Sequence, residues 1–369
     1  MKIHTNIEAM LFALLRSALH EEPAVCEPFR EATAEEWGAC YRLAAAQGVM
    51  AVAWEGAMTL PEELRPPRTL RLTWGLAVEK YEQQYARYCR TAAELSALYA
   101  ENGIVMVQMK GVGFSAHYPV PAHREGGDID IFTYSADTAV MSHREANELA
   151  NELMRRQGIE VDMHSPKHSN FYYKGVPVEN HRSFLNVTEY VVAARMERVL
   201  REHLLPRPTS LLDGECSIMT PSPSFNALFI AFHALQHYGS GLALHHLYDW
   251  ACLLQRYGWC LPVGADDAGM LRFIDAFTDL AHHLLGTELV RGADSGLMER
   301  IYGEMLHPRY HLRELPAKGR WGILVEKTRR LLYIHRLKGE VIQGSLARRL
   351  WDSVVFHLRH PETIFSTGK

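Results

Sequence analysis

The feature that most constrains the fold is a change of pattern near Gly103, where helical sequence gives way to strand sequence. Residues 104–109 (IVMVQM) are apolar and rich in β-branched side chains, and Gly103 and Gly111 bound them. This pattern is typical of a short buried strand. Residues 128–132 (DIDIF) alternate polar and apolar side chains, which predicts a second strand with one buried face. We therefore expect a β-sheet in the middle of the chain.

The sequence before this point is helical in pattern. Asn6 is placed to cap a first helix, and Thr33 with Glu36 forms a capping-box signature for a later one. A long helix is expected over about Leu70 to Glu101, because this segment has no glycine or proline after Gly75. The first hundred residues are thus predicted to form a helical region.

The second strand is followed by a charged helical pattern over residues 135–157. Further strands are expected at 159–163, 170–173 and 176–181, and Lys174-Gly175 is a hairpin signal between the last two. After Pro221 the helical spacing returns. The expected C-terminal elements are helices at 224–238, 242–257 and 267–285 and a basic amphipathic tail beyond Ile323.

These patterns divide the chain into three regions: a helical N-terminal region (1–100), a core of strands and helices (101–215) and a helical C-terminal region (216–369). Strands that alternate with helices and end in a hairpin predict a small mixed sheet. The expected fold class is therefore α+β, with a small mixed β-sheet flanked by helical regions on both sides.

Composition excludes several classes of protein. The 369 residues are 47% hydrophobic and 22% charged, which argues against intrinsic disorder, and the net charge of -4 argues against a general binder of polyanions. A membrane helix needs about 20 consecutive apolar residues, and we find no such run. The six cysteines are scattered without a CxxC pair, which is typical of reduced thiols and predicts a cytoplasmic protein.

Asp128 and Asp130 form the clearest chemical signal. Side chains two positions apart on a strand point to the same face, and two adjacent carboxylates repel each other unless a cation lies between them. Carboxylate oxygens suit Mg²⁺, although an isolated Asp-x-Asp is also common on exposed strands. Glu179, in the strand at 176–181, is a third carboxylate that could complete a metal site or accept a proton from an attacking hydroxyl. Asp162 competes with Glu179 for this role.

The surrounding glycines fit a phosphate site. Gly126-Gly127 directly precedes the second strand, where small residues allow a close approach to the backbone. Gly111 precedes a short helix and could present backbone amides to a phosphate.

The segment between the two strands resembles a known family. It contains Lys110-Gly111, then Tyr118-Pro119-x-Pro121, then Arg124-x-x-Gly127-Asp128-Ile129-Asp130-Ile131. This order resembles the signature of the uncharacterised nucleotidyltransferase family, within the DNA polymerase β-like superfamily. The resemblance covers about residues 100–255.

The motifs that follow this segment match the family less closely. Val178-Glu179-x-His181 resembles the third acidic motif of the family, which usually reads Glu-Leu-His, with Asn180 in place of the leucine. His233-x-x-x-His237 and Leu247-Tyr248-Asp249 resemble its helical C-terminal half. Val112 stands where the superfamily usually has serine or glycine, so backbone amides would have to bind the phosphate without a hydroxyl.

The resemblance implies a nucleotidyltransferase core that moves a nucleoside monophosphate from a nucleoside triphosphate, such as ATP, to an acceptor hydroxyl. Asp128 and Asp130 would bind Mg²⁺ or Mn²⁺, and Glu179 would hold a second metal or act as base. The acceptor could be a small molecule, a protein or a nucleic acid. The residues implied in binding the nucleotide are Lys110, Gly111, Arg124 and Gly127. Lys110 and Arg124 could instead be surface charges or form salt bridges to the carboxylates.

Two other interpretations stay open. His233 and His237 lie four residues apart, on one helix face, and His245-His246-x-x-Asp249 follows. These residues could form the site of a His/Asp metal-dependent phosphohydrolase, or the histidines could simply be hydrogen-bonded where helices pack. The remaining interpretation is a catalytically inactive nucleotide-binding protein of the same fold.

Overall fold

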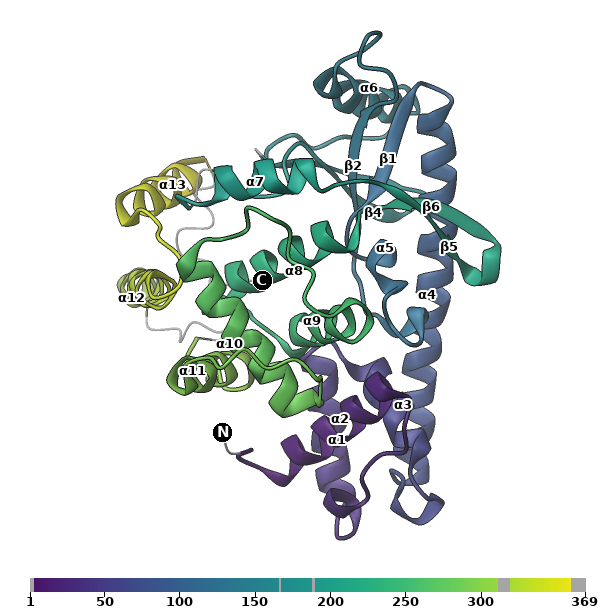
Figure 1. Cartoon of the computed structure of the whole chain (residues 1–369), viewed down its shortest axis with the longest axis vertical. Helices are drawn as coiled ribbons and strands as arrows, with labels where there is room; N and C mark the ends of the chain where they lie inside the picture. Colours follow the sequence, from purple (N-terminus) through teal and green to yellow (C-terminus); the bar gives the residue numbers. More distant parts are fainter. Residues whose placement is uncertain (1–2, 166, 188–189, 311–318, 360–369) are drawn as a thin grey trace.

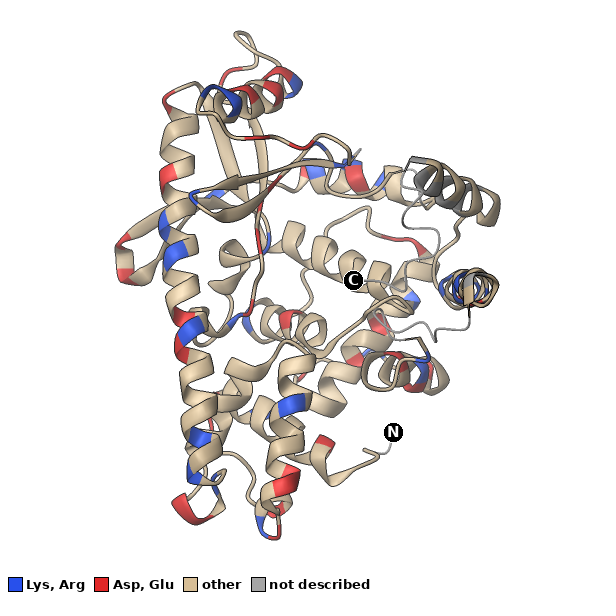
Figure 2. Ribbon diagram, turned by 180° about the vertical axis from the view of Figure 1, so that it is seen from behind, with Lys and Arg blue, Asp and Glu red and all other residues tan. Residues whose placement is uncertain are grey.

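The structure is a computed structural model that describes all residues except 1–2, 166, 188–189, 311–318 and 360–369, and the side chains of some residues in the last two helices. The helix α4 (Arg68–Ala100) runs along one side of the molecule (Figure 1). The sheet lies against its C-terminal half, and the C-terminal helices lie on the other side of the sheet (Figure 1). Positive and negative side chains are interspersed along α4 (Figure 2).

The N-terminal region is helical, as expected, with α1 (Asn6–His20), α2 (Ala34–Ala46) and α3 (Met50–Thr59) before α4. The capping box of Thr33 and Glu36 is confirmed. The prediction that Asn6 caps α1 is wrong, because Thr5 is the cap and forms its own capping box with Glu8. A threonine followed three residues later by glutamate satisfies two free amides at once, which the Asn6 side chain would not do.

The sheet is mixed and has the strand order β3-β4-β2-β1-β6-β5. β1 pairs with β2 antiparallel, while β2 with β4 and β1 with β6 are parallel pairs. The strands are β1 (Ile104–Gln108), β2 (Ile129–Ser135), β3 (His168–Tyr173), β4 (Val176–His181), β5 (Arg207–Leu211) and β6 (Cys216–Thr220). The mixed α+β fold class is therefore confirmed.

Three details differ from the sequence expectation. Residues 159–163 form no strand, because only Asp162 makes an isolated bridge, opposite Asn170. The hairpin of β5 and β6 was not predicted, since β5 is an exposed edge strand that contains Pro208 and lacks an apolar run. The sheet therefore extends to Thr220, past the expected end of the core at residue 215.

Helix α6 (His143–Arg156) begins later than the expected residue 135, after a capping box of Ser142 with Glu145. The expected helices at 224–238, 242–257 and 267–285 are confirmed within a few residues. The elements after β4, apart from the hairpin, are α7 (Ala193–Glu202), α8 (Pro223–His237), α9 (Leu244–Tyr257), α10 (Ala268–Leu285), α11 (Ser295–Leu306), α12 (Gly319–Gly339) and α13 (Leu346–Arg359). None of the described helices is long and apolar enough to cross a membrane.

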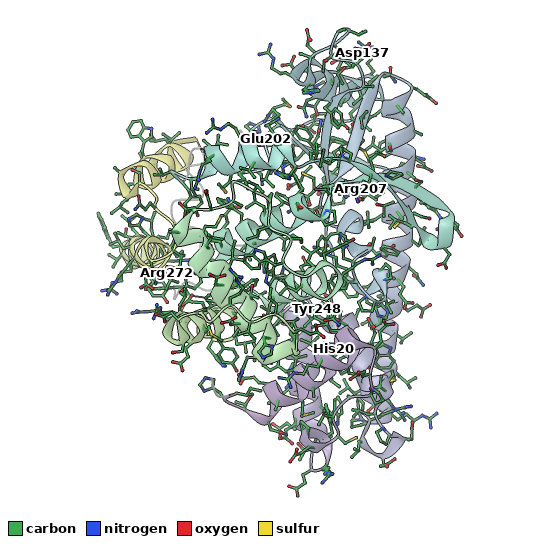
Figure 3. The ribbon with its side chains drawn as sticks, viewed as in Figure 1. His20, Asp137, Glu202, Arg207, Tyr248 and Arg272 are labelled. Carbon is green, nitrogen blue, oxygen red and sulfur yellow. The ribbon has the colours of Figure 1, made fainter. Side chains whose placement is uncertain are left out.

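The two faces of the sheet pack against different helices. Ile129 and Ile131 of β2 belong to an apolar cluster with α4 and α6, whereas Phe132 belongs to a larger cluster with the N-terminal and C-terminal helices. Tyr248 of α9 is fully buried within that larger cluster (Figure 3). Because side chains alternate along a strand, the even-numbered residues of β2 face the helical body. This alternation directs Asp130 away from α4 and toward α8 and α9.

Candidate active site

The three acidic residues singled out from the sequence lie together. Asp128 directly precedes β2, Asp130 lies on β2, and Glu179 lies on β4. β2 and β4 are parallel, and their register places Asp130 directly beside Glu179. One carboxylate oxygen from each of the three residues lies within 4.8 Å of the others.

Asp162, the competing third carboxylate, lies apart from this group. Its Oδ1 accepts a hydrogen bond of 2.8 Å from the amide of His164, and its side chain is about half exposed. Glu179 is therefore the third carboxylate by position, as the hairpin pattern favoured.

Asp130 is the most deeply buried member of the group. Its side chain is 0% exposed, and its Oδ1 accepts hydrogen bonds from His181 Nε2 at 3.0 Å and from Lys110 Nζ at 3.2 Å. Burial alone would raise the pKa of Asp130, but the charges and hydrogen bonds of Lys110 and His181 outweigh it and lower the pKa. Asp130 is thus ionised at neutral pH. Its buried Oδ2 has no hydrogen-bond partner among the described residues.

The other two carboxyl groups differ in protonation. Burial, together with the adjacent charge of Asp130, raises the pKa of Asp128 to about 6. Burial would raise the pKa of Glu179, but the hydrogen bond with His181 and the charges of His168 and His181 together outweigh it and lower the pKa. The group therefore holds two firmly ionised carboxylates and a third whose charge depends on pH near neutrality.

This donor set fits a hard divalent cation. A buried carboxylate oxygen without a partner carries a cost that a bound cation would remove. Two or three carboxylate oxygens at this spacing are typical ligands of Mg²⁺, which completes its shell with water or substrate phosphate. Asp128, Asp130 and Glu179 are the residues that would hold such an ion.

The turn after β1 is shaped by glycine. Gly111 has φ 63°, and a Cβ there would lie 2.9 Å from the backbone oxygen of Asp128. A Cβ at Gly113 would lie 2.6 Å from the backbone oxygen of Gln108. The amides of Phe114 and Ser115 donate to the carbonyl oxygen of Gly111, so the candidates for binding phosphate are the amides of residues 111–113.

Arg124 has a different place from the one expected. Its Nε and a terminal nitrogen donate to the two carboxylate oxygens of Asp249 at 2.9 and 2.8 Å, and the other terminal nitrogen donates to the Gly111 carbonyl at 3.2 Å. The Tyr118 hydroxyl also donates to Asp249, at 2.6 Å. Arg124 therefore clamps the glycine turn to α9 and is not a free cation for the triphosphate. Lys110 is paired with Asp130, one of the alternatives that the sequence left open.

The Gly126-Gly127 segment is held by α4. Gln84 Nε2 donates to the carbonyl oxygen of Gly126 at 2.6 Å, and the Tyr88 hydroxyl donates to that of Gly127 at 3.2 Å. A Cβ at Gly127 would meet no other atom within 4 Å. Gly127 therefore borders open space beside Asp128 rather than a tight backbone contact.

A cleft of about 160 Å³ lies over Asp128 and Asp130. One wall consists of the Lys110–Gly111 turn, Gly127, Asp128 and Asp130. The opposite wall comes from α8 and α9, as expected for helices that cover the sheet. The helical residues that line it are Phe229, Ile230, His233, His245, His246 and Asp249.

Comparison with known proteins agrees with this geometry. A family model described as an uncharacterised nucleotidyltransferase matches residues 33–286, more than half of the chain. The chain belongs to this family. The match includes the N-terminal helices from α2 onward as well as the sheet, the turn and both walls of the cleft.

Other comparisons add little. A crystal structure of an antigenic nucleotidyltransferase-like protein from Paracoccidioides brasiliensis has 11% sequence identity and a TM-score of 0.33, and the match covers 56% of this chain and 94% of that chain. A likeness of this degree supports no argument. No curated protein matches the chain significantly.

Two histidines lie around the carboxylates: His181, which the sequence placed in the third acidic motif without a role, and His168, which it did not single out. His181 bonds Asp130 and lies 3.4 Å from Glu179 Oε2. His168 lies opposite His181 in the β3–β4 hairpin, with its Nδ1 3.2 Å from Glu179 Oε2 but not aligned for a hydrogen bond. Counting back from the Lys174-Gly175 turn would have paired His168 with His181, so the signal was present in the sequence.

Asn180, which replaces the leucine of the family motif, stabilises the strands from the face opposite the carboxylates. It is buried on the α6 side of β4, where its Oδ1 accepts from Asn147 Nδ2 at 2.9 Å and its Nδ2 donates to Asn151 Oδ1 at 3.2 Å. The Thr133 hydroxyl of β2 also donates to Asn180, at 3.0 Å. This network joins β2, β4 and α6, and so fixes the strands that carry the carboxylates.

Proposed function

We propose that the chain transfers a nucleoside monophosphate from a nucleoside triphosphate to an acceptor hydroxyl, with Mg²⁺ or Mn²⁺ held by Asp128, Asp130 and Glu179. Membership of the family supports a general nucleotidyltransferase function. The single observation that carries the metal-dependent reaction is the pairing of Asp130 with Glu179 beside Asp128, with a buried Asp130 oxygen that lacks a partner.

A divalent cation bound there would neutralise phosphate oxygens and stabilise the charge that develops in an in-line displacement at the α-phosphorus. The acceptor oxygen would form the new bond to phosphorus, and pyrophosphate would leave. Lys110 brings a positive charge to the same wall, beside Asp130. The glycine turn would position the phosphates through its backbone amides.

Glu179 could act as a metal ligand or as a general base, and its pKa favours one of these roles. A general base works best when its pKa lies near the working pH, and the pKa of Glu179 is lowered below its ordinary value. Glu179 is therefore better suited to bind a cation than to accept the proton of the acceptor hydroxyl.

A His/Asp phosphohydrolase site would need Asp249 as a metal ligand, and Asp249 is already engaged by other side chains. Both oxygens of Asp249 are bonded to Arg124, and one also accepts from Tyr118, so this carboxylate is already neutralised. No other carboxylate joins the histidines of α8 and α9 among the groups of possible metal ligands in the described part of the chain.

A cytoplasmic location is part of the proposal. All six cysteines are free, and Cys40, Cys89, Cys216 and Cys252 are buried. Burial raises the pKa of the Cys40 and Cys89 thiols to about 12, which makes them unreactive. Such thiols are compatible with a reducing compartment.

The test is incubation of the protein with each labelled nucleoside triphosphate in the presence of Mg²⁺ or Mn²⁺. We expect pyrophosphate release with one or more nucleotides, and transfer of the label to protein or to an added acceptor. Asp130→Asn should abolish both, whereas the matched variant Asp162→Asn should behave as the parent. Metal-dependent binding of nucleotide without any release, across a broad set of acceptors, would favour the inactive nucleotide-binding protein. Equal release by the parent and Asp130→Asn would overturn the proposal.

A further inference from the structure

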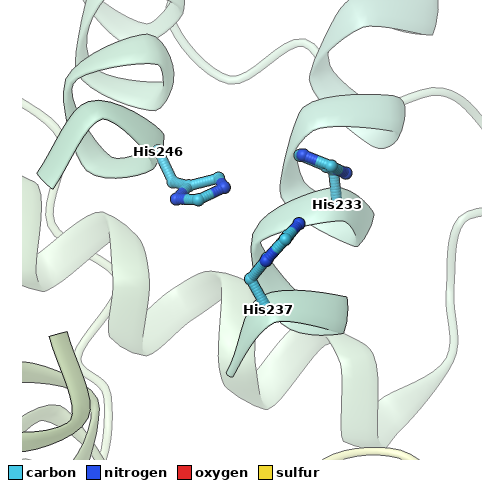
Figure 4. Close-up of side chains that lie close together, drawn as sticks. All are labelled: His233, His237 and His246. Carbon is cyan, nitrogen blue, oxygen red and sulfur yellow. The ribbon is translucent and has the colours of Figure 1, made fainter. Parts of the chain in front are cut away.

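Three histidines of α8 and α9, two of which line the cleft, point toward one another. His233 and His237 lie one turn apart on α8, and His246 lies in the first turn of α9 (Figure 4). One ring nitrogen from each histidine lies within 4.8 Å of the others. The ring centroids of His237 and His246 are 4.8 Å apart, and those of His233 and His237 are 4.5 Å apart. The rings therefore share one small space between two helices.

The polar atoms of these rings are poorly satisfied by the protein. Within the described part of the chain, neither His233 nor His237 has a hydrogen bond, and their neighbours are aromatic rings. The interpretation of these two histidines as hydrogen-bonded packing residues is therefore not supported. Both side chains are only partly buried, so their unbonded ring nitrogens are accessible to a ligand.

The third ring is oriented by the backbone. The amide of Ala243 donates to Nδ1 of His246 at 3.1 Å, and the Ala243 carbonyl oxygen lies 3.3 Å from the same nitrogen. For Nε2 to bind a metal, Nδ1 must carry the proton and donate to this carbonyl instead of accepting from the amide. A backbone carbonyl bonded to the far ring nitrogen is the arrangement that commonly orients a histidine bound to a metal.

We propose that His233, His237 and His246 form a three-histidine site for a divalent transition metal of the Zn²⁺ type. Imidazole nitrogens favour Zn²⁺ and related ions over Mg²⁺, and three protein ligands leave a fourth position for water or a substrate atom. The site has no carboxylate ligand, because Asp249 is bonded to Arg124 and Tyr118. It is separate from the Asp128–Asp130–Glu179 group, although His233 and His246 line the same cleft.

The electrostatic surroundings agree with this assignment. Burial lowers the pKa of all three histidines, to about 4 for His237, and Lys110 contributes to the lowering at each ring. The rings are therefore neutral at physiological pH, which is the form that binds metals.

The experiment uses full-length protein freed of metal and titrated with Co²⁺, whose visible absorption is intense in four-coordinate nitrogen sites and weak in six-coordinate oxygen sites. We expect one such Co²⁺ per chain, displaced by Zn²⁺ and unaffected by excess Mg²⁺. His237→Gln should lower the Co²⁺ affinity by at least about 100-fold. His117→Gln is the matched control, since His117 is also buried with a pKa lowered to about 4 but lies outside the group. This control and Asp128→Asn should both retain the signal.

The outcomes separate this site from the proposed transfer site. Loss of the signal in Asp128→Asn together with its retention in His237→Gln would place the metal at the carboxylates and overturn the proposal. Absence of a four-coordinate signal in the parent protein would also overturn it, whatever the result of the nucleotide assay. If His237→Gln proves unfolded by circular dichroism, His233→Gln provides the same test. A rise in melting temperature on addition of Zn²⁺, absent in the histidine variant and present in His117→Gln, would support the site independently.

Discussion

The two walls of the cleft carry opposite kinds of side chain. The sheet wall holds the carboxylates of Asp128 and Asp130, with Glu179 beside them, and the ammonium group of Lys110, so it is charged and rich in oxygen. The helical wall holds the neutral imidazoles of His233 and His246. The strands set the spacing of the carboxylates, and the packing of α8 against α9 sets the spacing of His233 and His246. The difference shows how one cleft can offer separate sites for a hard and a softer cation.

The walls are joined at one buried ion pair. Arg124 comes from the segment before β2, and Asp249 comes from α9. Both side chains are less than 10% exposed, and a third bond reaches the Gly111 carbonyl. The distance between the two walls therefore depends on this pair, which makes it the first target for breaking the arrangement.

The largest effect on stability is expected for Arg124→Gln. It leaves the Asp249 carboxylate buried without a compensating charge, which should lower the free energy of unfolding by about 3 to 5 kcal/mol. Urea unfolding followed by circular dichroism would measure it. The matched control is Arg195→Gln, which removes an exposed ion pair with Asp266 and should cost less than about 1 kcal/mol. If the two variants lose similar amounts of unfolding free energy, the Arg124–Asp249 pair does not hold the two walls together.

A second prediction concerns the sheet wall alone. Glu179→Gln should weaken Mg²⁺-dependent nucleotide binding by about 10- to 100-fold, because it removes one negative charge from the cation site. Asp162→Asn, the other carboxylate suggested by sequence, should leave binding unchanged. Isothermal titration with a nonhydrolysable triphosphate would measure both. The opposite ranking would return the third-ligand role to Asp162.

The pH dependence of metal binding should also distinguish the walls. The pKa of Asp128 is raised to about 6, so protons compete with the cation on the sheet wall below that pH. Mg²⁺ affinity should fall by up to about tenfold per pH unit there. The pKa of His237 is lowered to about 4, so binding of Zn²⁺ by the histidines should persist to lower pH. If the affinities for Mg²⁺ and Zn²⁺ fall over the same pH range, the two metals do not bind at separate sites.

The smallest effect is a gain in stability without metal. The pKa of Asp128 in the folded chain, about 6, exceeds its ordinary value of 3.8. Its contribution to stability is therefore fully present below pH 3.8 and is lost as the pH rises through 6. Asp128→Asn should raise the free energy of unfolding at neutral pH by about 1 to 2 kcal/mol, after allowance for partial exposure. At pH 4 the variant and the parent should unfold at nearly the same urea concentration.

Much of the sheet wall could be predicted from short-range patterns. Asp128 and Asp130 were found because strand alternation is local, and the Lys174-Gly175 turn identified the hairpin that carries Glu179. The edge hairpin of β5 and β6 could not be found in this way. It has no apolar run on β5, and β6 is held by a parallel pairing with β1, which lies more than a hundred residues earlier in the chain.

The sequence by itself determined the order of most helices and strands, the glycine turn after β1, and the pair of aspartates, all of which depend on neighbours within a few residues. Only the tertiary structure decided which charges are free. For Arg124 the sequence left open contact with the triphosphate, a surface charge or a salt bridge, and the structure pairs it with Asp249, 125 residues away. Such pairings depend on how helices pack across the cleft, and burial then shifts each pKa according to partners that no local pattern specifies.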